Sequence, residues 1–191
     1  MGPGRLVFPK RDGPEYQGNN VRIVGGAFKG RDLLSPNDFR VRPTAEHVRA
    51  GMLDLLAADL ANARVLELFA GTGAIGIEAL SRGAKTVDFI ETRPASLHAL
   101  RANIASFRLR DRSRIFKRDA LQFASLLREG SYEIAIADPP YGSKMLDRVV
   151  DMWIETRFSP VLAVEHERGH ALPGRALRKS FEDTTVSIYR V

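Results

Sequence analysis

Apolar residues follow two spacings along this chain, and each spacing predicts a different kind of element. Short runs that are almost wholly apolar suit strands buried on both faces of a parallel sheet. Such runs occur at 64–69, 86–90, 115–116, 134–137 and 160–164. Between them apolar residues recur at helical spacing, which predicts helices at 75–83, 94–107, 120–129 and 143–156. This repeating order predicts a doubly wound, mostly parallel α/β sheet whose strand order reverses at its centre.

The two ends of the chain add strands to this repeat. Residues 177–181 and 185–189 alternate between apolar and polar and predict a terminal antiparallel pair, which brings the sheet to seven strands. Residues 21–24 also alternate, Gly25-Gly26 permits a tight turn, and 28–34 would be the return strand. We therefore expect a single domain over residues 21–191, with a β-hairpin appendage at 21–36.

Two N-terminal segments carry other signals. Residues 1–20 hold four glycines and three prolines with few apolar residues, which predicts a flexible tail. Residues 40–44 are expected to form a loop before a helix whose apolar stripe runs to about residue 61. Thr44 suits the N-cap position of that helix.

Composition limits the class of protein. The 191 residues are 44% hydrophobic and 27% charged, which is ordinary for a globular domain. The chain has no cysteine, which excludes disulfides, thiolate metal sites and a cysteine nucleophile, and its four histidines lack the spacing of metal ligands. No apolar run approaches the roughly 18 residues of a membrane span, and the N-terminus lacks a signal-peptide core. We expect a cytoplasmic protein without a metal.

Charge points to a polyanionic partner. The net charge is +6, the pI is about 10.0, and all but six of the 29 cationic side chains are arginines. Such a surface favours nucleic acid through phosphate neutralisation, although a merely solvated basic surface is the alternative. Candidates for RNA contact lie on the hairpin and around the start of the following helix: Arg22, Lys29, Arg31, Arg42 and Arg49. A basic cluster at 108–118 mostly precedes a strand, opposite the ligand edge, and is interpreted as solvated surface.

The stretch 138–141, Asp-Pro-Pro-Tyr, follows the buried strand at 134–137 without a break. The two prolines lack backbone donors and fix φ, so the strand must end in a stiff, extended turn. Ligands of open α/β sheets bind at the carboxyl ends of strands. There Asp138 and the Pro139 carbonyl could accept the two hydrogens of a nucleobase amine, and Tyr141 could stack on the ring. An incidental strand-ending turn is the alternative.

A second ligand signal is the turn Ala70-Gly71-Thr72-Gly73-Ala74, between a strand and a helix. Glycines let the backbone approach a ligand, and the helix N-terminus offers free N–H groups. Gly71, Gly73 and Gly76 fit the dinucleotide pattern G-x-G-x-x-G, which is a weak signal alone. Glu91 ends the next strand, 20 residues after Gly71, where a carboxylate can accept hydrogen bonds from both ribose hydroxyls.

Four stretches together resemble a known family, the bacterial 16S ribosomal RNA guanine-N2 methyltransferases of the RsmD type. V-R-I-V-G-G-A-F-K-G-R-D-L at 21–33 is similar to its N-terminal hairpin, and R-P-T-A-E-H-V-R at 42–49 to its first loop and helix. L-E-L-F-A-G-T-G-A-I-G-I-E-A-L-S-R-G at 66–83 is similar to its cofactor motif, and D-P-P-Y at 138–141 to its catalytic motif. The resemblance covers about residues 21–191.

The resemblance implies S-adenosylmethionine as cofactor, within a Rossmann-like class I methyltransferase fold. The residues it implies for the cofactor site are Thr44, Glu67, Phe69, Gly71, Gly73, Glu91, Asp119 and Ala120. The catalytic residues it implies are Asp138, Pro139, Pro140 and Tyr141. The implied partner is 16S ribosomal RNA, as naked RNA or within an assembling small subunit, and the enzyme is expected to be a monomer.

Other functions stay open at this point. A DNA adenine-N6 methyltransferase also uses D-P-P-Y, but usually carries a target-recognition insertion that this chain lacks. A nicotinamide-dependent oxidoreductase would explain the glycine turn and leave D-P-P-Y unexplained. A non-catalytic RNA-binding module would leave the intact cofactor turn unexplained.

Overall fold

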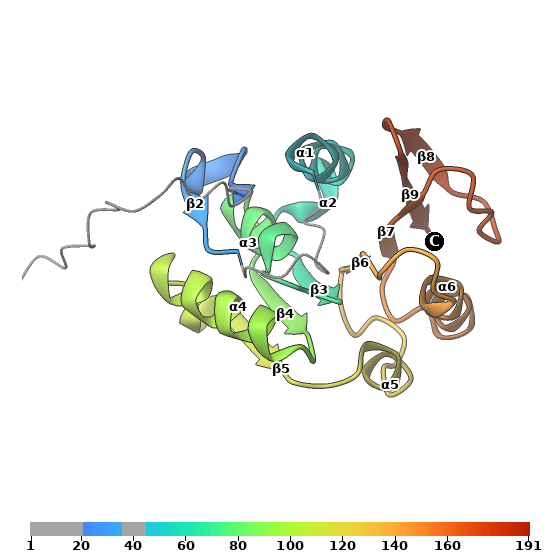
Figure 1. The fold of residues 1–191 in the computed structure, drawn as a ribbon. Helices are drawn as coiled ribbons and strands as arrows, with labels where there is room; N and C mark the ends of the chain where they lie inside the picture. Colours follow the sequence, from blue (N-terminus) through green and yellow to red (C-terminus); the bar gives the residue numbers. More distant parts are fainter. Residues whose placement is uncertain (1–20, 36–44) are drawn as a thin grey trace, which may run out of the picture.

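The computed structural model describes residues 21–35 and 45–191. Its centre is a sheet with strand order β5-β4-β3-β6-β7-β9-β8 (Figure 1). The strands are β3 (Arg64–Leu68), β4 (Thr86–Ile90), β5 (Ser113–Phe116), β6 (Ile134–Ala137), β7 (Val161–Glu167), β8 (Leu177–Ser180) and β9 (Thr184–Arg190). The first five pair in parallel, whereas β9 pairs antiparallel with both β7 and β8. The predicted doubly wound sheet of seven strands is confirmed.

Helices cover both faces of this sheet (Figure 1). One face carries α1 (Glu46–Leu55), α2 (Ala57–Leu60), α3 (Ala74–Ser81) and α4 (Pro94–Ser106). The other carries α5 (Ala120–Ala124) and α6 (Met145–Thr156). Successive residues of β6 divide the core: Ile134 and Ile136 pack on the first side, and Ala135 and Ala137 on the second. Burial on both sides explains why the sequence of this strand is a continuous apolar run.

The hairpin is present, but its strands are shorter than predicted. β1 (Val21–Arg22) pairs antiparallel with β2 (Asp32–Leu33), and a short 3-10 helix, η1 (Gly26–Phe28), lies between them. The Ser81 hydroxyl of α3 accepts from the Phe28 N–H at 2.8 Å and donates to the Gly25 carbonyl at 2.6 Å. These contacts with α3 replace strand pairing near the turn, so the prediction of strands over 21–24 and 28–34 was wrong in length.

Two helix predictions also change. The helix expected up to residue 61 is divided at Leu56, which has φ −97° and ψ 2° and is fully buried. Its N-cap residue is Ala45, and the expected cap Thr44 lies outside the described residues. The helix expected over 120–129 ends at Ala124, because the N–H groups of Leu126 and Leu127 bond carbonyls three residues back rather than four.

The strand order reverses between β3 and β6, since β4 and β5 continue on one side of β3 and β6 and β7 on the other. In a doubly wound sheet this reversal opens a crevice at the carboxyl ends of the strands, where ligands bind. The turns that follow β3 and β6, which carry the glycines and D-P-P-Y, therefore begin side by side. Among the described helices, none has the length and apolar character needed to cross a membrane.

Candidate active site

The D-P-P-Y turn leaves β6 at the reversal of strand order. Pro139 is buried, Asp138 is partly buried, and Pro140 and Tyr141 are exposed. The Ser143 hydroxyl donates to the Pro140 carbonyl at 2.7 Å and closes the turn. Since each proline also fixes its own φ, the four predicted catalytic residues lie in one stiff segment at the ligand edge of the sheet.

Tyr141 is held in place by residues that the sequence analysis did not assign to the site. Its hydroxyl lies 2.7 Å from the Thr184 Oγ1 and 3.1 Å from the Glu165 Oε1. Thr184 Oγ1 donates in turn to the His166 carbonyl at 2.8 Å. Burial, together with the Glu165 charge, raises the pKa of Tyr141 to about 12, so the hydroxyl keeps its proton at neutral pH. The ring is therefore anchored at its far end, as a stacking surface requires.

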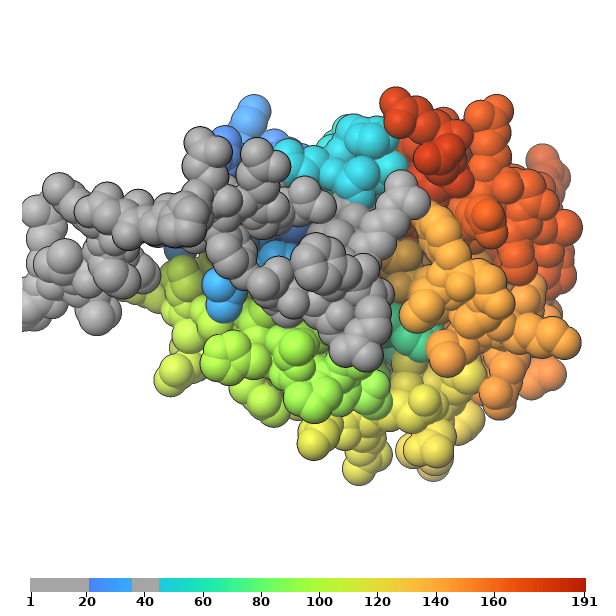
Figure 2. All heavy atoms as spheres, viewed as in Figure 1, coloured from blue at the N-terminus to red at the C-terminus, as the bar shows by residue number. Residues whose placement is uncertain are grey.

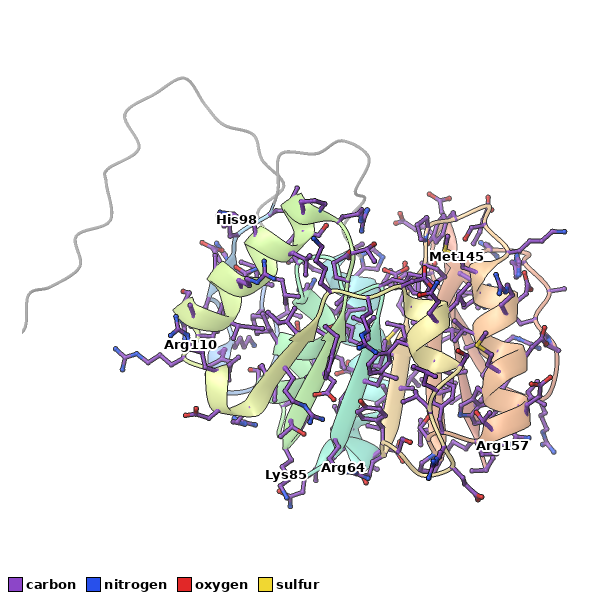
Figure 3. The ribbon with its side chains drawn as sticks, turned by 90° about the horizontal axis from the view of Figure 1, so that it is seen from below. Arg64, Lys85, His98, Arg110, Met145 and Arg157 are labelled. Carbon is purple, nitrogen blue, oxygen red and sulfur yellow. The ribbon has the colours of Figure 1, made fainter. Side chains whose placement is uncertain are left out.

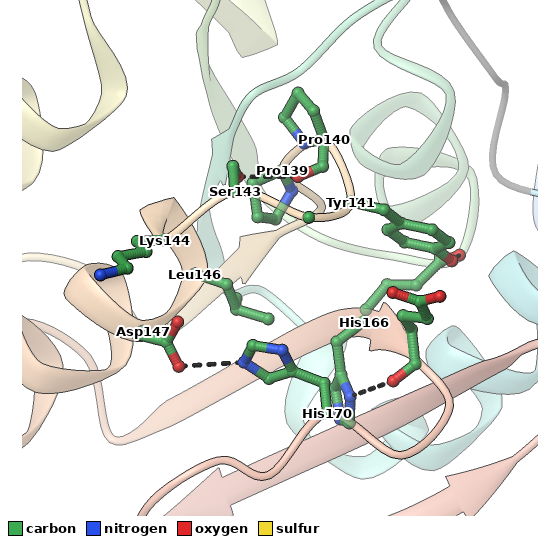
Figure 4. Close-up of a pocket in the computed structure, with 12 residues that line it drawn as sticks. Pro139, Pro140, Tyr141, Ser143, Lys144, Leu146, Asp147, His166 and His170 are labelled. Atoms are coloured by element: carbon green, nitrogen blue, oxygen red, sulfur yellow. Dashed lines mark hydrogen bonds and ion pairs between the residues drawn. The ribbon is translucent and has the colours of Figure 1, made fainter.

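A cavity of about 280 Å³ opens beside this turn (Figure 4). Pro139, Pro140 and Tyr141 contribute to its lining, together with side chains from the start of α6 and the end of β7. His170 lies 2.9 Å from Asp147 Oδ1 within the cavity lining. His166 lies between the Ser187 hydroxyl at 2.8 Å and the Glu167 carbonyl at 3.0 Å, and burial lowers its pKa. A concave site with fixed polar groups beside an aromatic ring suits a flat, polar ligand.

A second cavity, of about 190 Å³, brings together four of the eight residues predicted for the cofactor site, whereas Gly71 and Gly73 do not line it. Phe69, Glu91, Asp119 and Ala120 follow three different strands, and all four line it. The lining is completed by residues that were not predicted for the cofactor site, namely Ile90, Thr92, Arg93, Arg118, Pro140 and Met145. Because Pro140 lines both cavities, the predicted cofactor site lies directly beside the D-P-P-Y turn.

Glu91 joins the glycine turn to this second cavity. Its Oε2 accepts from the Gly71 N–H at 2.8 Å, and its Oε1 accepts from the N–H groups of Thr92 and Arg93, both at 2.8 Å. The carboxylate is 5% exposed, so these backbone donors fix its orientation where it lines the cavity. A fixed, buried carboxylate suits the recognition of a diol such as ribose.

Replacing Glu91 by alanine is expected to weaken cofactor binding by about 1.5–3 kcal/mol, the range for hydrogen bonds to a charged group. Titration calorimetry with S-adenosylhomocysteine measures this loss. Glu91→Gln keeps one acceptor and should lose less. If Glu91→Ala binds as tightly as the wild type, Glu91 does not contact the cofactor.

The glycine turn is shaped by two close approaches of the backbone. Gly73 has φ +78°, precedes α3, and has no room for a Cβ, which would lie 2.4 Å from Leu100 Cδ1. A Cβ on Gly76 would lie 2.5 Å from Glu67 Oε2. Phe69, just before the turn, has φ +60°, a left-handed conformation that is costly for an aromatic residue and that recurs at functional sites.

Glu67 lies under the turn and does not line the second cavity. Its Oε2 accepts from the Gly76 N–H at 2.9 Å, and the side chain is 3% exposed. Burial raises its pKa to about 8, and the charges of Asp138 and Glu91 add to this shift. Contact of Glu67 with the cofactor stays a prediction, while its observed role is to attach α3 to β3.

The raised pKa of Glu67 predicts a pH-dependent stability. The unfolded carboxyl ionises from about pH 4.5, whereas the folded one keeps its proton up to about pH 8. The stabilising contribution of this group is therefore complete below pH 4.5 and is lost as pH rises to 8. Glu67→Gln cannot ionise and should be more stable than the wild type at pH 7 by up to about 3 kcal/mol. Each pH unit above the pKa of the unfolded carboxyl, up to that of the folded one, costs the wild type about 1.4 kcal/mol.

Urea unfolding at pH 5 and pH 7.5 measures this difference, because the variant should lack most of the wild type's fall in stability. Equal pH dependence in the two proteins would show that Glu67 is ionised in the folded state.

Of the residues predicted to contact RNA, three are exposed, as RNA contact requires, and one is buried. Arg22, Lys29 and Arg31 are exposed on the hairpin, although Arg22 pairs with Asp32 at 2.9 Å. Figure 2 shows that the hairpin reaches the surface near α1 and α4. The Arg31 guanidinium lies 3.9 Å from the centre of the Phe107 ring and donates to the Ser106 carbonyl at 2.9 Å. Arg31 therefore also attaches the hairpin to the end of α4.

The assignment of Arg49 to RNA contact was wrong. Its side chain is 0% exposed and pairs with the equally buried Glu78 at 2.9 Å. It also donates to the Arg22 carbonyl of β1. Arg49 therefore fixes the hairpin against α1 and α3. The predicted contact Arg42, like Thr44, lies outside the described residues.

The arginines of the basic cluster at 108–118 do not all have the same surroundings. Arg114 pairs with Asp88 at 2.6 Å, and Arg112 donates to the carbonyls of Lys85 and Ala84. Only its last part reaches the ligand edge, where Arg118 lines the second cavity. In Figure 3, Met145 lies at that edge, and Arg64, Lys85 and Arg157 lie at the opposite one. The sequence prediction did not assign Arg118 to the site because it interpreted the whole cluster as solvated surface.

Comparison with known proteins assigns the family. A family model described as "Conserved hypothetical protein 95" matches residues 21–184. The ribosomal RNA small subunit methyltransferase D of Escherichia coli K12 is 32% identical over 167 residues, which cover 84% of this chain and 82% of that protein. The chain belongs to the RsmD family of S-adenosylmethionine-dependent methyltransferases.

Solved structures support the fold of this RsmD-family chain. A solved structure from Escherichia coli described as "Putative methyltransferase yhhF" superposes with a TM-score of 0.77 at 28% identity, covering 90% of this chain and 97% of that one. An RNA methyltransferase from Salinibacter ruber, solved with S-adenosyl-L-homocysteine, superposes with a TM-score of 0.61 over 78% and 93% of the two chains. At 20% identity the second likeness shows the fold alone.

Proposed function

We propose that this RsmD-family enzyme transfers a methyl group from S-adenosylmethionine to the exocyclic N2 amine of one guanine in 16S ribosomal RNA. The observation that carries the proposal is the junction at Pro140, where the D-P-P-Y turn and the predicted cofactor cavity share a wall. The carboxylate and the aromatic ring of that turn would thereby lie next to a site suited to a nucleoside cofactor. We further propose a cytoplasmic monomer that acts on the RNA alone or within an assembling small subunit.

The residues of the second cavity fit S-adenosylmethionine. Glu91 would hold the ribose, Asp119 and Ala120 the adenine, and Phe69 an apolar side of the nucleoside. Asp119 caps α5 through a 2.9 Å bond from the Gln122 N–H to its Oδ1, which fixes its side chain. The glycine turn would pass under the methionine portion, with Gly71 tied to Glu91. When bound, the cofactor supplies an electrophilic methyl group.

The chain's own residues would orient the acceptor. The lone pair of a guanine N2 is delocalised into the ring, so the amine is a weak nucleophile. Asp138 and the Pro139 carbonyl would accept its two hydrogens and favour a tetrahedral nitrogen, which is mainly an orientation effect. The Asp138 carboxylate would also stabilise the positive charge that develops on the nitrogen and would take up the proton released. Tyr141, anchored by Thr184, would stack on the extruded base.

The hairpin would hold the RNA, and Lys29 is the cleanest test because Arg31 also supports the fold. Lys29→Glu should weaken binding to small ribosomal subunits and lower the slope of log affinity against log salt by roughly one. Arg128→Glu makes the same change of charge at an exposed residue beyond α5, on the opposite face of the sheet from the hairpin, and serves as control. If the two variants bind alike, the hairpin is only a structural cover.

The identity of the methylated nucleoside tests the proposal as a whole. Small subunits from a strain that lacks this enzyme are incubated with the protein and methyl-labelled cofactor, and their RNA is digested to nucleosides. Labelled N2-methylguanosine is expected. Label in N6-methyladenosine, or in DNA offered in parallel, would favour the adenine methyltransferase instead.

A further inference from the structure

Asn103 connects two parts of the molecule that the proposed function assigns to different ligands. This α4 residue is 2% exposed, although an amide is costly to bury without partners. Its Oδ1 accepts from the Leu34 N–H at 2.7 Å, and its Nδ2 donates to the Leu34 carbonyl at 3.0 Å. The same Nδ2 donates to the Thr72 carbonyl at 3.0 Å. One side chain therefore bonds the end of the hairpin and the middle of the glycine turn.

The connection continues to the cofactor cavity through one covalent step along the chain and one further hydrogen bond. Thr72 follows Gly71 directly, and the Gly71 N–H donates to Glu91 Oε2, whose carboxylate lines that cavity. At the other end, Leu34 follows β2, whose Leu33 pairs with Val21 of β1. The path from hairpin to cavity thus runs through Leu34, Asn103, Thr72, Gly71 and Glu91.

The other described contacts of the hairpin hold it without reaching the turn. Ser81 and Glu78 bond its backbone from α3, and Ser106 and Phe107 hold Arg31 from α4. Among the residues described, Asn103 is the one whose side chain bonds both the hairpin and the glycine turn. Its removal would therefore separate the two parts while leaving the hairpin attached at several other points.

We propose that Asn103 is a positioning residue that couples occupancy of the cofactor cavity to RNA binding at the hairpin. The proposal rests on the proposed function, in which the hairpin holds the RNA. A cofactor that orders the glycine turn would, through Thr72 and Asn103, also order the hairpin, and the ordered hairpin would bind RNA more tightly. By linkage, RNA must then raise the affinity for the cofactor by the same factor.

The test measures that factor. The affinity of the protein for small ribosomal subunits from a strain lacking the enzyme is determined with and without saturating S-adenosylhomocysteine, which cannot react. In the wild type we expect the cofactor product to tighten binding at least about fivefold, the lower end of typical coupling. In Asn103→Ala the factor should fall to about one. A purely structural role would weaken binding in both conditions and leave the factor unchanged.

Ser81→Ala is the matched control, because it removes two hydrogen bonds to the hairpin and leaves the bridge at Asn103 intact. It should keep the coupling factor of the wild type. A factor of one in the wild type, or a full factor in Asn103→Ala, would overturn the proposal.

Hydrogen exchange in the wild type gives a second readout that needs neither RNA nor a folded variant. The N–H groups of Ile23 and Gly30, bonded within the hairpin at 2.9 and 2.8 Å, should exchange more slowly when S-adenosylhomocysteine is added. Unchanged exchange would overturn the coupling. Failure to form N2-methylguanosine would instead refute the proposed function without altering the exchange result.

Discussion

Replacing Arg49 by alanine is expected to lower the free energy of unfolding by about 3 kcal/mol or more, because it leaves the buried Glu78 carboxylate without its fully buried partner. Both side chains are fully buried, and their closest atoms are 2.9 Å apart. Arg82 still reaches Glu78 Oε1 at 2.7 Å, which places the expected loss at the low end of the range for broken buried ion pairs. The change also removes the donor to the Arg22 carbonyl, so the hairpin should loosen first.

Urea unfolding of the variant measures this loss, and a double replacement serves as control. Arg49→Met with Glu78→Met removes both charges and keeps side-chain volume, so it should recover much of the stability that Arg49→Ala loses. Wild-type stability in Arg49→Ala, combined with weakened RNA binding, would restore the interpretation of Arg49 as a surface contact.

Local patterns predicted the parts of this molecule whose chemistry is contained in a few consecutive residues. The D-P-P-Y turn follows a buried strand because two prolines cannot continue it, and the glycine turn needs residues without a Cβ. Their position at one edge then follows from the parallel order of the strands. This is why Phe69, Glu91 and Asp119 meet in one cavity as the sequence indicated.

Local sequence patterns could not predict the roles of residues whose partners lie far away in the chain. Arg49 looked like a surface cation because its partner Glu78 lies 29 residues away, and only packing of α1 on α3 buries both. Glu165 and Thr184 hold Tyr141 from strands that follow it by 24 and 43 residues. Asn103 lies in an ordinary helical stretch, and the sequence offers no sign of its bonds to Leu34 and Thr72.

Asp138→Ala is expected to lower the rate of methyl transfer roughly 100-fold or more, by analogy with the loss of one preorganised partner of a transition state. The residue follows β6 directly at the strand-order reversal, and its charge adds to the raised pKa of the buried Glu67 carboxyl. The fold should persist, since the change lies at a strand end and opens no cavity in the core. Cofactor affinity should change much less than rate, because the carboxylate would act on the target amine.

Asp138→Asn separates orientation from charge. Its amide oxygen can still accept one amine hydrogen, while the negative charge that would stabilise the developing cation is gone. The rate of this variant should therefore lie between those of the wild type and Asp138→Ala. Glu91→Ala offers the contrast, since it should reduce cofactor affinity more than the rate at saturating cofactor.

The most direct measurement is single-turnover methyl transfer at saturating cofactor, with small-subunit RNA carrying the unmodified target guanine, for the wild type and both Asp138 variants. We expect N2-methylguanosine as the product and rates that fall in the order wild type, Asp138→Asn, Asp138→Ala, with the alanine variant slower by roughly 100-fold or more. An alanine variant that transfers methyl at nearly the wild-type rate would contradict the mechanism, whatever family the chain belongs to.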